Sequence, residues 1–111
     1  MNKFISDIFK PFNIDVVDTL YKGKKDKFIV YQIYEEESLY ADNRPQSYQY
    51  SGNFRFYSNG KYLDIKDIKN MLIDNHFVIE NDYFRTYETD TKLYVHGLNF
   101  NFNRVDLLNN N

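Results

Sequence analysis

Apolar side chains recur along this chain with two periods, one typical of helices and one typical of strands. The helical period appears in residues 2–12, where Pro11 limits the helix to about two turns. It appears again in residues 61–75, where Asp64 is expected to cap the true start of the helix. The sequence therefore predicts a short N-terminal helix and one longer helix, each with one apolar face.

Strand-like segments fill most of the remaining chain. Residues 14–21 and 28–35 are rich in β-branched and aromatic side chains. Residues 46–58 alternate most clearly, with aromatic rings on one face and Gly52 at the middle of that face. This Gly52 is expected to mark a bulge or a close approach of the backbone. Two further strands are predicted at 77–83 and 93–102.

The predicted order is helix, strand, strand, long strand, helix, strand, strand. This order indicates an α+β fold, in which a mostly antiparallel sheet of four to five strands carries both helices on one face. Residues 1–111 are expected to form one domain, with a helix in 1–12 and a fraying polar tail in 103–111. Residues 38–45 contain several turn-forming residues and are expected to be a loop.

Composition and charge exclude several classes of protein. The 111 residues are 42% hydrophobic and 27% charged, which is typical of a globular protein. The absence of cysteine excludes disulfides, zinc–thiolate sites and a thiol nucleophile. A net charge of -2 argues against a nucleic-acid binder with a broad basic face. Without an apolar run of about 18 residues or a signal-peptide core, we expect a soluble intracellular protein.

No arrangement of residues points to a reaction, so we expect neither enzymatic activity nor a cofactor or metal. His76 follows a helix and His96 lies on a strand face, and both positions suit structural roles. There is no pair of His residues with metal-ligand spacing and no Gly-rich phosphate loop. Two charge runs, the lysines in 22–27 and the glutamates in 35–37, are more simply solvated than bound to an anion or a cation.

Aromatic content leaves a binding module as the alternative. The chain has 11 Tyr and 10 Phe, a content that the codon bias of AT-rich genomes partly explains. Tyr side chains that the core cannot accommodate would suit an interface. Residues 52–56, GNFRF, resemble faintly the aromatic strand of an RNA-recognition sheet. The same rings also fit the core-facing side of an amphipathic strand.

Three stretches, taken in order, resemble one family. The first is residues 34–45, where a Tyr-Glu-Glu strand end leads into YADNRP. The second is the long strand 48–58, which runs directly into the predicted helix, and the third is YETDTKLY at 87–94, followed by His96-Gly97. They resemble the small tail-completion or tail-terminator proteins of long-tailed bacteriophages and prophages, over roughly residues 14–102. The Asn-rich C-terminus lies outside this pattern.

The resemblance implies a structural role. Such proteins are monomers that assemble into a ring, usually a hexamer, at the head-proximal end of the tail tube. The ring ends tail growth and joins the tail to the head connector, and DNA passes through it without specific binding. The implied partners are further copies of the chain, the tail tube protein and the head–tail connector protein. The implied location is a virion tail assembled in the cytoplasm of the bacterial host, with no membrane contact.

Segments 35–45 and 87–92 are the candidate contact regions, because both are polar segments with embedded Tyr beside strong strands. A closed ring needs a head-to-tail interface, which can also pair the two edges of a small sheet between neighbours. The candidate interface residues are Tyr40, Asp42, Arg44, Tyr57, Tyr83, Arg85, Tyr87, Glu88, Asp90 and Lys92. Acidic residues that would line the lumen and repel DNA are Glu35, Glu36, Glu37 and Asp42. The alternative is that both segments are ordinary connections.

Overall fold

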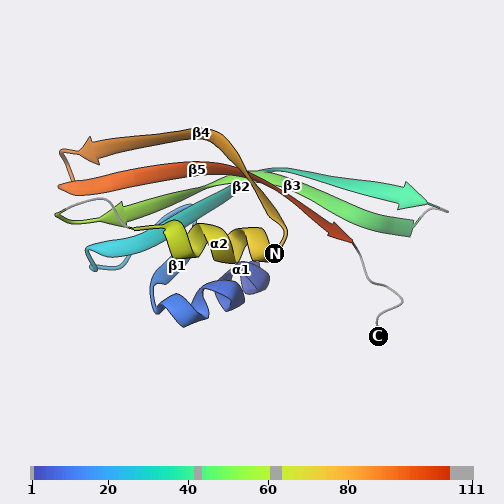
Figure 1. The fold of residues 1–111 in the computed structure, drawn as a ribbon, viewed down its shortest axis with the longest axis horizontal. Helices are drawn as coiled ribbons and strands as arrows, with labels where there is room; N and C mark the ends of the chain where they lie inside the picture. The colour runs from blue at the N-terminus through green and yellow to red at the C-terminus, as the bar shows by residue number, and fades with distance from the viewer. Residues whose placement is uncertain (1, 42–43, 61–63, 106–111) are drawn as a thin grey trace.

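Two helices lie on one face of a single sheet (Figure 1). The computed structural model describes residues 2–41, 44–60 and 64–105, except for the side chains of 35, 37–41, 44–48, 81–83 and 104–105. The elements are α1 (Asn2–Phe9), a 3₁₀ helix η1 (Lys10–Phe12), β1 (Asp15–Asp18), β2 (Lys27–Ala41), β3 (Arg44–Ser58), α2 (Lys66–Asp74), β4 (Phe77–Glu88) and β5 (Leu93–Val105).

The strands lie in the order β1-β2-β3-β5-β4. β1 runs parallel to β2, and the other neighbouring pairs are antiparallel. The predicted α+β class, mostly sheet with a short N-terminal helix, is confirmed. The predicted count of four to five strands is too low. A register shift between Ile79 and Tyr83 divides β4 into two separately paired segments, which makes six in an open mixed sheet.

The main core lies between the helices and the central strands. Phe54 is fully buried, with its ring centroid 4.8 Å from that of Phe100 and 5.7 Å from that of Phe9 in α1. The predicted alternation of 46–58 therefore points its aromatic face toward the helices. Burial of side chains of this size contributes about 2–3 kcal/mol each. The core residues supplied by the helices are Ile5, Phe9, Ile68 and Leu72.

Gly52 sits at a closely packed position of the sheet. β2 has a bulge between Ile33 and Glu35, directly across from Gly52. A Cβ atom on Gly52 would overlap the carbonyl oxygen of Gln32 and the ring of Phe100. Both the bulge and the close backbone approach expected from the sequence are therefore present.

α2 begins later than predicted. Its first residue is Lys66, whose backbone N–H donates a hydrogen bond to Asp64 Oδ1 at 3.1 Å. The expected N-cap position is nevertheless occupied by Ile65, which makes no side-chain cap hydrogen bond, so Asp64 lies one residue before the cap. The helix has nine residues, one more than α1. Positions 61–63 of the predicted helix lie outside the described residues.

The predicted loop at 38–45 is wrong for most of its length. β2 continues to Ala41 and β3 begins at Arg44, and these two residues pair with each other. β5 likewise continues through 103–105, which the sequence assigned to a fraying tail, because Val105 pairs with Ser47. A ribbon beyond the helix-covered core needs no apolar face, so its polar composition resembles that of a loop.

This ribbon makes the molecule long. The principal extents are 52 × 26 × 25 Å, and the radius of gyration is 15.5 Å. A compact chain of this length would have a radius of gyration of about 13 Å. Figure 1 shows the far ends of β2 and β3 extending away from the helices, on the side opposite to the β4–β5 turn.

Candidate assembly surfaces

The face of the sheet opposite the helices, here called the open face, has an apolar end. Phe28, Val30, Tyr57, Leu93 and Val95 form a second buried cluster there. The rings of Tyr21 and Tyr57 stack on the two sides of Phe28, with centroid distances of 3.9 and 4.6 Å. Tyr57, a predicted interface residue, is only 7% exposed in this stack and so offers little contact area.

The lysine-rich loop between β1 and β2 is tied to the sheet. The Tyr21 hydroxyl donates to Asp15 Oδ2 at 2.9 Å, and Lys25 Nζ donates to Asp15 Oδ1 at 3.1 Å. The hydrogen bond from Tyr21, and then that from Lys25, lower the pKa of the Asp15 carboxyl below its usual value. Lys25 therefore already has an internal partner, which weakens the interpretation of this loop as an anion site.

The middle of the open face is polar. Ser51 Oγ donates to Asn101 Oδ1 at 2.7 Å, and Asn101 Nδ2 donates to Glu80 Oε1 at 2.7 Å. The guanidinium of Arg55 lies 6.0 Å from the centroid of the Tyr57 ring. This chain of hydrogen bonds fixes amide and hydroxyl groups, rather than aromatic rings, on the exposed side of β3 and β5.

That arrangement bears on the RNA-binding alternative. Phe54 and Phe56, the rings of the GNFRF segment, are fully buried on the helix side. Recognition of single-stranded RNA on a sheet needs such rings exposed for stacking on bases. The resemblance to an RNA-recognition strand is therefore wrong for these two residues, and their role is in the core.

Two edges of the sheet are unpaired in the part of the chain that the structure describes. β1 pairs with β2 only at 28–31, so the outer side of β2 from Gln32 to Ala41 has no partner strand there. β4 is the last strand on the other side, and its outer side has no partner strand in the same described part. We call these the β2 edge and the β4 edge. Such edges expose backbone N–H and C=O groups that can pair with another chain.

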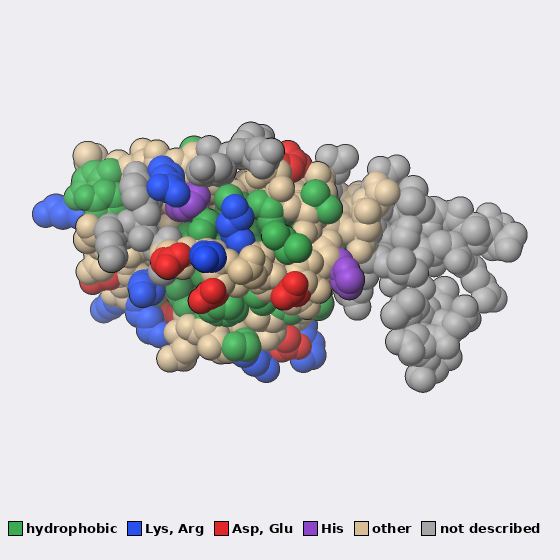
Figure 2. Space-filling view, viewed as in Figure 1, with side chains coloured by type: hydrophobic (Ala, Val, Ile, Leu, Met, Phe, Trp, Pro, Cys, Tyr) green, Lys and Arg blue, Asp and Glu red, His purple; other side chains and the backbone are tan. Residues whose placement is uncertain are grey.

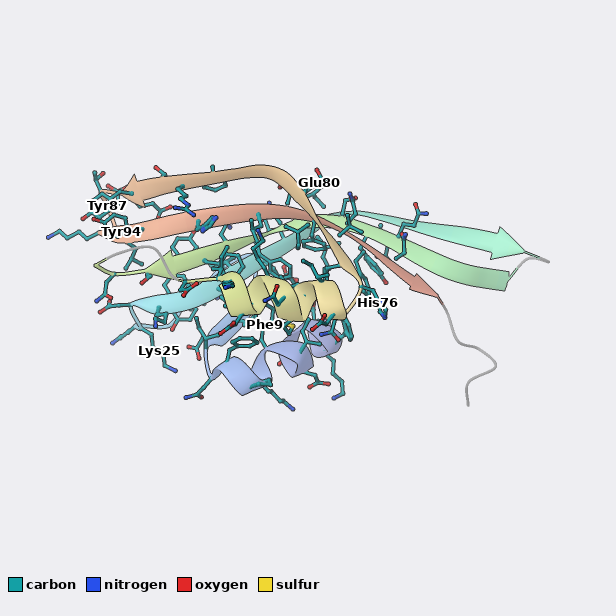
Figure 3. All side chains as sticks on the ribbon, in the orientation of Figure 1. Phe9, Lys25, His76, Glu80, Tyr87 and Tyr94 are labelled. Atoms are coloured by element: carbon teal, nitrogen blue, oxygen red, sulfur yellow. The ribbon has the colours of Figure 1, made fainter. Side chains whose placement is uncertain are left out.

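Large apolar side chains are exposed along both edges. Tyr34 in β2 is 61% exposed, and Phe84 and Tyr87 in β4 are 50% and 45% exposed. The Phe84 ring lies over Gly97, where a Cβ atom would overlap it. Tyr87 packs edge-on against Tyr94 with ring centroids 4.9 Å apart, at the end of the β4–β5 hairpin (Figure 3).

The β4–β5 turn is well ordered by local hydrogen bonds. The Lys92 N–H donates to the Glu88 carbonyl at 2.8 Å, and Thr91 Oγ1 donates to Glu88 Oε1 at 3.0 Å. Lys92 adopts a left-handed conformation with φ of 61°. Polar residues at 81–82 and at 87–91 both suit a turn between the strands predicted at 77–83 and 93–102, and the structure has the later turn.

The predicted interface residues fall at the two ends of the molecule. The described ones at the β4–β5 end are Arg85, Tyr87, Glu88, Asp90 and Lys92, all exposed except the half-buried Glu88. The backbones of Tyr40 and Arg44 lie at the ribbon end. The side chains of Tyr40, Arg44 and Tyr83, and all of Asp42, lie outside the described part.

Only Glu36 of the four proposed lumen residues has a described side chain, and it is exposed on β2. The side chains of Glu35 and Glu37 and the whole of Asp42 lie outside the described part. On the helices, acidic and basic side chains are interspersed (Figure 2). The described side chains on this side of the molecule therefore carry charges of both signs.

His96 lies on the helix side of the sheet and has a strongly lowered pKa. Its side chain is buried beside Phe56, with ring centroids 6.4 Å apart. Burial, reinforced by the positive charges of Arg85 and Lys69, lowers the pKa of His96 to about 4. A histidine held neutral in this way suits packing better than proton transfer near neutral pH.

Two open cavities flank the N-terminal helix, with volumes of about 250 and 220 Å³. Asn13 and Ile14 line both, and the second also contains Lys27, Asp64 and Asp67. Among the described residues, no group of three or more His, Asp or Glu side chains is placed to hold a metal ion. The same part of the chain contains no helix long and apolar enough to cross a membrane.

Comparison with known proteins does not assign this chain to a family. The sequence matches no family model, and none of the curated proteins matches it.

The sequence analysis missed two features of these surfaces. It assigned residues 38–41 of the β2 edge to a loop, and it treated the polar sides of β3 and β5 as ordinary solvent faces. The repeated Asn at 99, 101 and 103 is the sequence signal that could have identified the second feature.

Proposed function

We propose that this protein is a tail-completion protein of a long-tailed bacteriophage or prophage. It assembles head to tail into a ring, of six copies by the family resemblance, on the head-proximal end of the tail tube. There it ends tail growth and joins the tail to the head connector. The protein acts by contact with neighbouring proteins and carries out no reaction.

One observation carries this proposal. The two sets of candidate contact residues lie at opposite ends of a 52 Å molecule, and each set adjoins an unpaired sheet edge. A closed ring needs two different surfaces on each copy, one that contacts the preceding copy and one that contacts the following copy. A molecule with distinct and well-separated ends meets that requirement, whereas a twofold dimer would use one surface twice.

The lumen of the proposed ring would be acidic where the β2–β3 ribbon faces it. Glu36 is exposed on that ribbon, and its neighbours in sequence are also glutamates. Repulsion between these carboxylates and the phosphates would let DNA slide through without being held. If an assembled ring placed Glu36 on its outer rim, this part of the proposal would have to be abandoned.

Deletion of the gene in the parent phage or prophage tests the role directly. Electron microscopy of lysates should show overlong tubes if the protein ends tail growth, or normal tails detached from heads if it joins the two. Normal infectious particles would show that the proposal is wrong. A small binding module would then be the remaining interpretation, and retention of a labelled oligonucleotide at low salt that is lost at high salt would identify its ligand as nucleic acid.

A further inference from the structure

We propose that copies of this chain join by sheet extension, with residues 83–86 of β4 in one copy pairing antiparallel to residues 35–38 of β2 in the next. The pairing places Arg85 opposite Glu36, so that the negative charge proposed for the lumen would come from its neighbours Glu35 and Glu37. This proposal rests on the ring-forming role proposed above and names the surfaces that would build the ring. The occupant of each edge is therefore a second copy of the same chain.

The two edges have matching regular stretches. On the β2 edge, residues 35–39 keep one register with β3 and lie between two register shifts. On the β4 edge, residues 83–88 keep one register with β5 after the shift that follows Ile79. These runs are about 17 and 20 Å long at the usual rise per residue. Regular, unpaired runs of this length are the parts of an edge strand that most readily accept another strand.

The strand directions fit a head-to-tail repeat. Because each neighbouring pair from β2 to β4 is antiparallel, β2 and β5 run one way and β3 and β4 the other. A second copy in the same orientation, placed beyond β4, therefore presents its β2 antiparallel to β4. The two edges differ from each other, so the contact is heterologous and repeats from copy to copy.

The faces of the sheet allow Arg85 to pair with Glu36. Arg85 lies opposite His96, which lies opposite the buried Phe56 on the helix side. Glu36 lies opposite Tyr50, which is also buried on the helix side. Residues opposite one another across strands point to the same face, so Arg85 and Glu36 can face each other across an extended sheet.

Charge favours this register over the next one that keeps the faces matched. Arg85 and Glu36 are both exposed and carry opposite charges. Sliding β4 by two residues would instead place Glu88 opposite Glu35, two residues of like charge. Opposite charges across strands stabilise a pairing and like charges destabilise it, which selects the first register.

The stagger between copies is consistent with closure into a ring. Arg85 is level with Phe56 on β3 and Glu36 is level with Tyr50, a difference of six positions or about 20 Å along the strands. Where β1 is absent, each copy adds four strands, or about 19 Å, across them. These two displacements incline the strands by about 45° to the ring axis, at the upper end of the range for closed barrels.

Disulfide trapping of purified protein tests the pairing, because the chain has no cysteine of its own. The double variant Arg85→Cys/Glu36→Cys, oxidised at high protein concentration, should give a ladder of linked multimers on a non-reducing gel. The control variant Thr86→Cys/Glu36→Cys moves one thiol to the other face of the same strand and should give no ladder. Each single variant should stop at dimers, since it has one thiol.

A ladder from the Arg85/Glu36 pair alone would support the proposal. Equal ladders from both double variants, or no species above a dimer from the Arg85/Glu36 pair, would overturn it. Circular dichroism that matches the wild-type spectrum shows that each variant is folded, as expected for changes at exposed positions. The cross-linking result does not depend on the gene-deletion test. Normal particles after gene deletion would overturn the proposed tail role, but they would not show whether β4 of one copy pairs with β2 of another.

Discussion

The carbonyl oxygen of Gln32 lies so close to the Cα of Gly52 that a side chain at position 52 has no room. We therefore expect Gly52→Ala to lower the free energy of unfolding by about 2–3 kcal/mol, since overpacking against the backbone forces the strands to shift. Urea denaturation followed by circular dichroism measures this loss.

Gly97→Ala is the matched control for that substitution. The three atoms nearest to a Cβ at Gly97 all belong to the ring of Phe84, which is half exposed and can swing aside. We expect a loss of no more than about 1 kcal/mol. Equal losses for the two alanine variants would contradict the interpretation of Gly52 as a site of close backbone approach.

His96 should make the protein less stable in mild acid. Its pKa is about 4 in the folded chain and about 6.5 when unfolded, because burial and the nearby Arg85 and Lys69 disfavour the proton. Between pH 6.5 and pH 4 the unfolded state therefore binds more protons than the folded state. The free energy of unfolding should fall by about 2–3 kcal/mol across this window and then stop falling on account of this group.

His96→Gln should remove most of that pH dependence. The measurement is the change in urea midpoint between pH 6.5 and pH 4, which is independent of any overall loss of stability in the variant. His76→Asn is the control, because His76 is exposed and asparagine tolerates its left-handed φ of 73°. If the change in urea midpoint in His96→Gln equals that of the wild type, His96 is not the group responsible for the pH dependence.

The hydroxyl of Tyr31 anchors the start of α1. It donates a hydrogen bond to Asn2 Oδ1 at 2.7 Å, while the ring is buried in the main core. Tyr31→Phe keeps the ring and removes this bond, so we expect a loss of about 1 kcal/mol in the free energy of unfolding. Tyr34→Phe, at an exposed position of the same strand, should change stability by less than about 0.5 kcal/mol. Indistinguishable urea midpoints for the two variants would count against this role of Tyr31.

Charge exchange tests the electrostatic part of the proposed pairing. Arg85→Glu alone, or Glu36→Arg alone, places like charges opposite each other and should weaken self-association at low salt several-fold. The double variant Arg85→Glu/Glu36→Arg restores opposite charges and should recover most of the loss. Analytical ultracentrifugation at matched concentrations measures both effects. Failure of the double variant to recover would mean that these two residues do not face each other.

Local sequence determined the elements whose two faces differ strongly in polarity. The alternation in β3 and in β5, and the apolar faces of the two helices, are visible along the chain because each of these elements has one side in water and one in the core. The same reasoning predicted the bulge and close approach at Gly52, and it predicted that Asp64 precedes the true start of the second helix. These features depend on residues near one another in the sequence.

Tertiary structure decided the rest. The far end of β2 extends beyond the helices, and residues 35–45 carry no strand pattern, so the pairing of this segment follows only from β3 beside it. The break in β4 is visible only in its pairing with β5. The burial of Tyr57 depends on the stacking of its ring on Phe28, which in turn stacks on Tyr21. Candidate contact residues could be chosen by type from the sequence. Their separation to opposite ends of the molecule comes from strand order, because hydrogen bonding between distant segments, rather than local composition, sets which edges remain open.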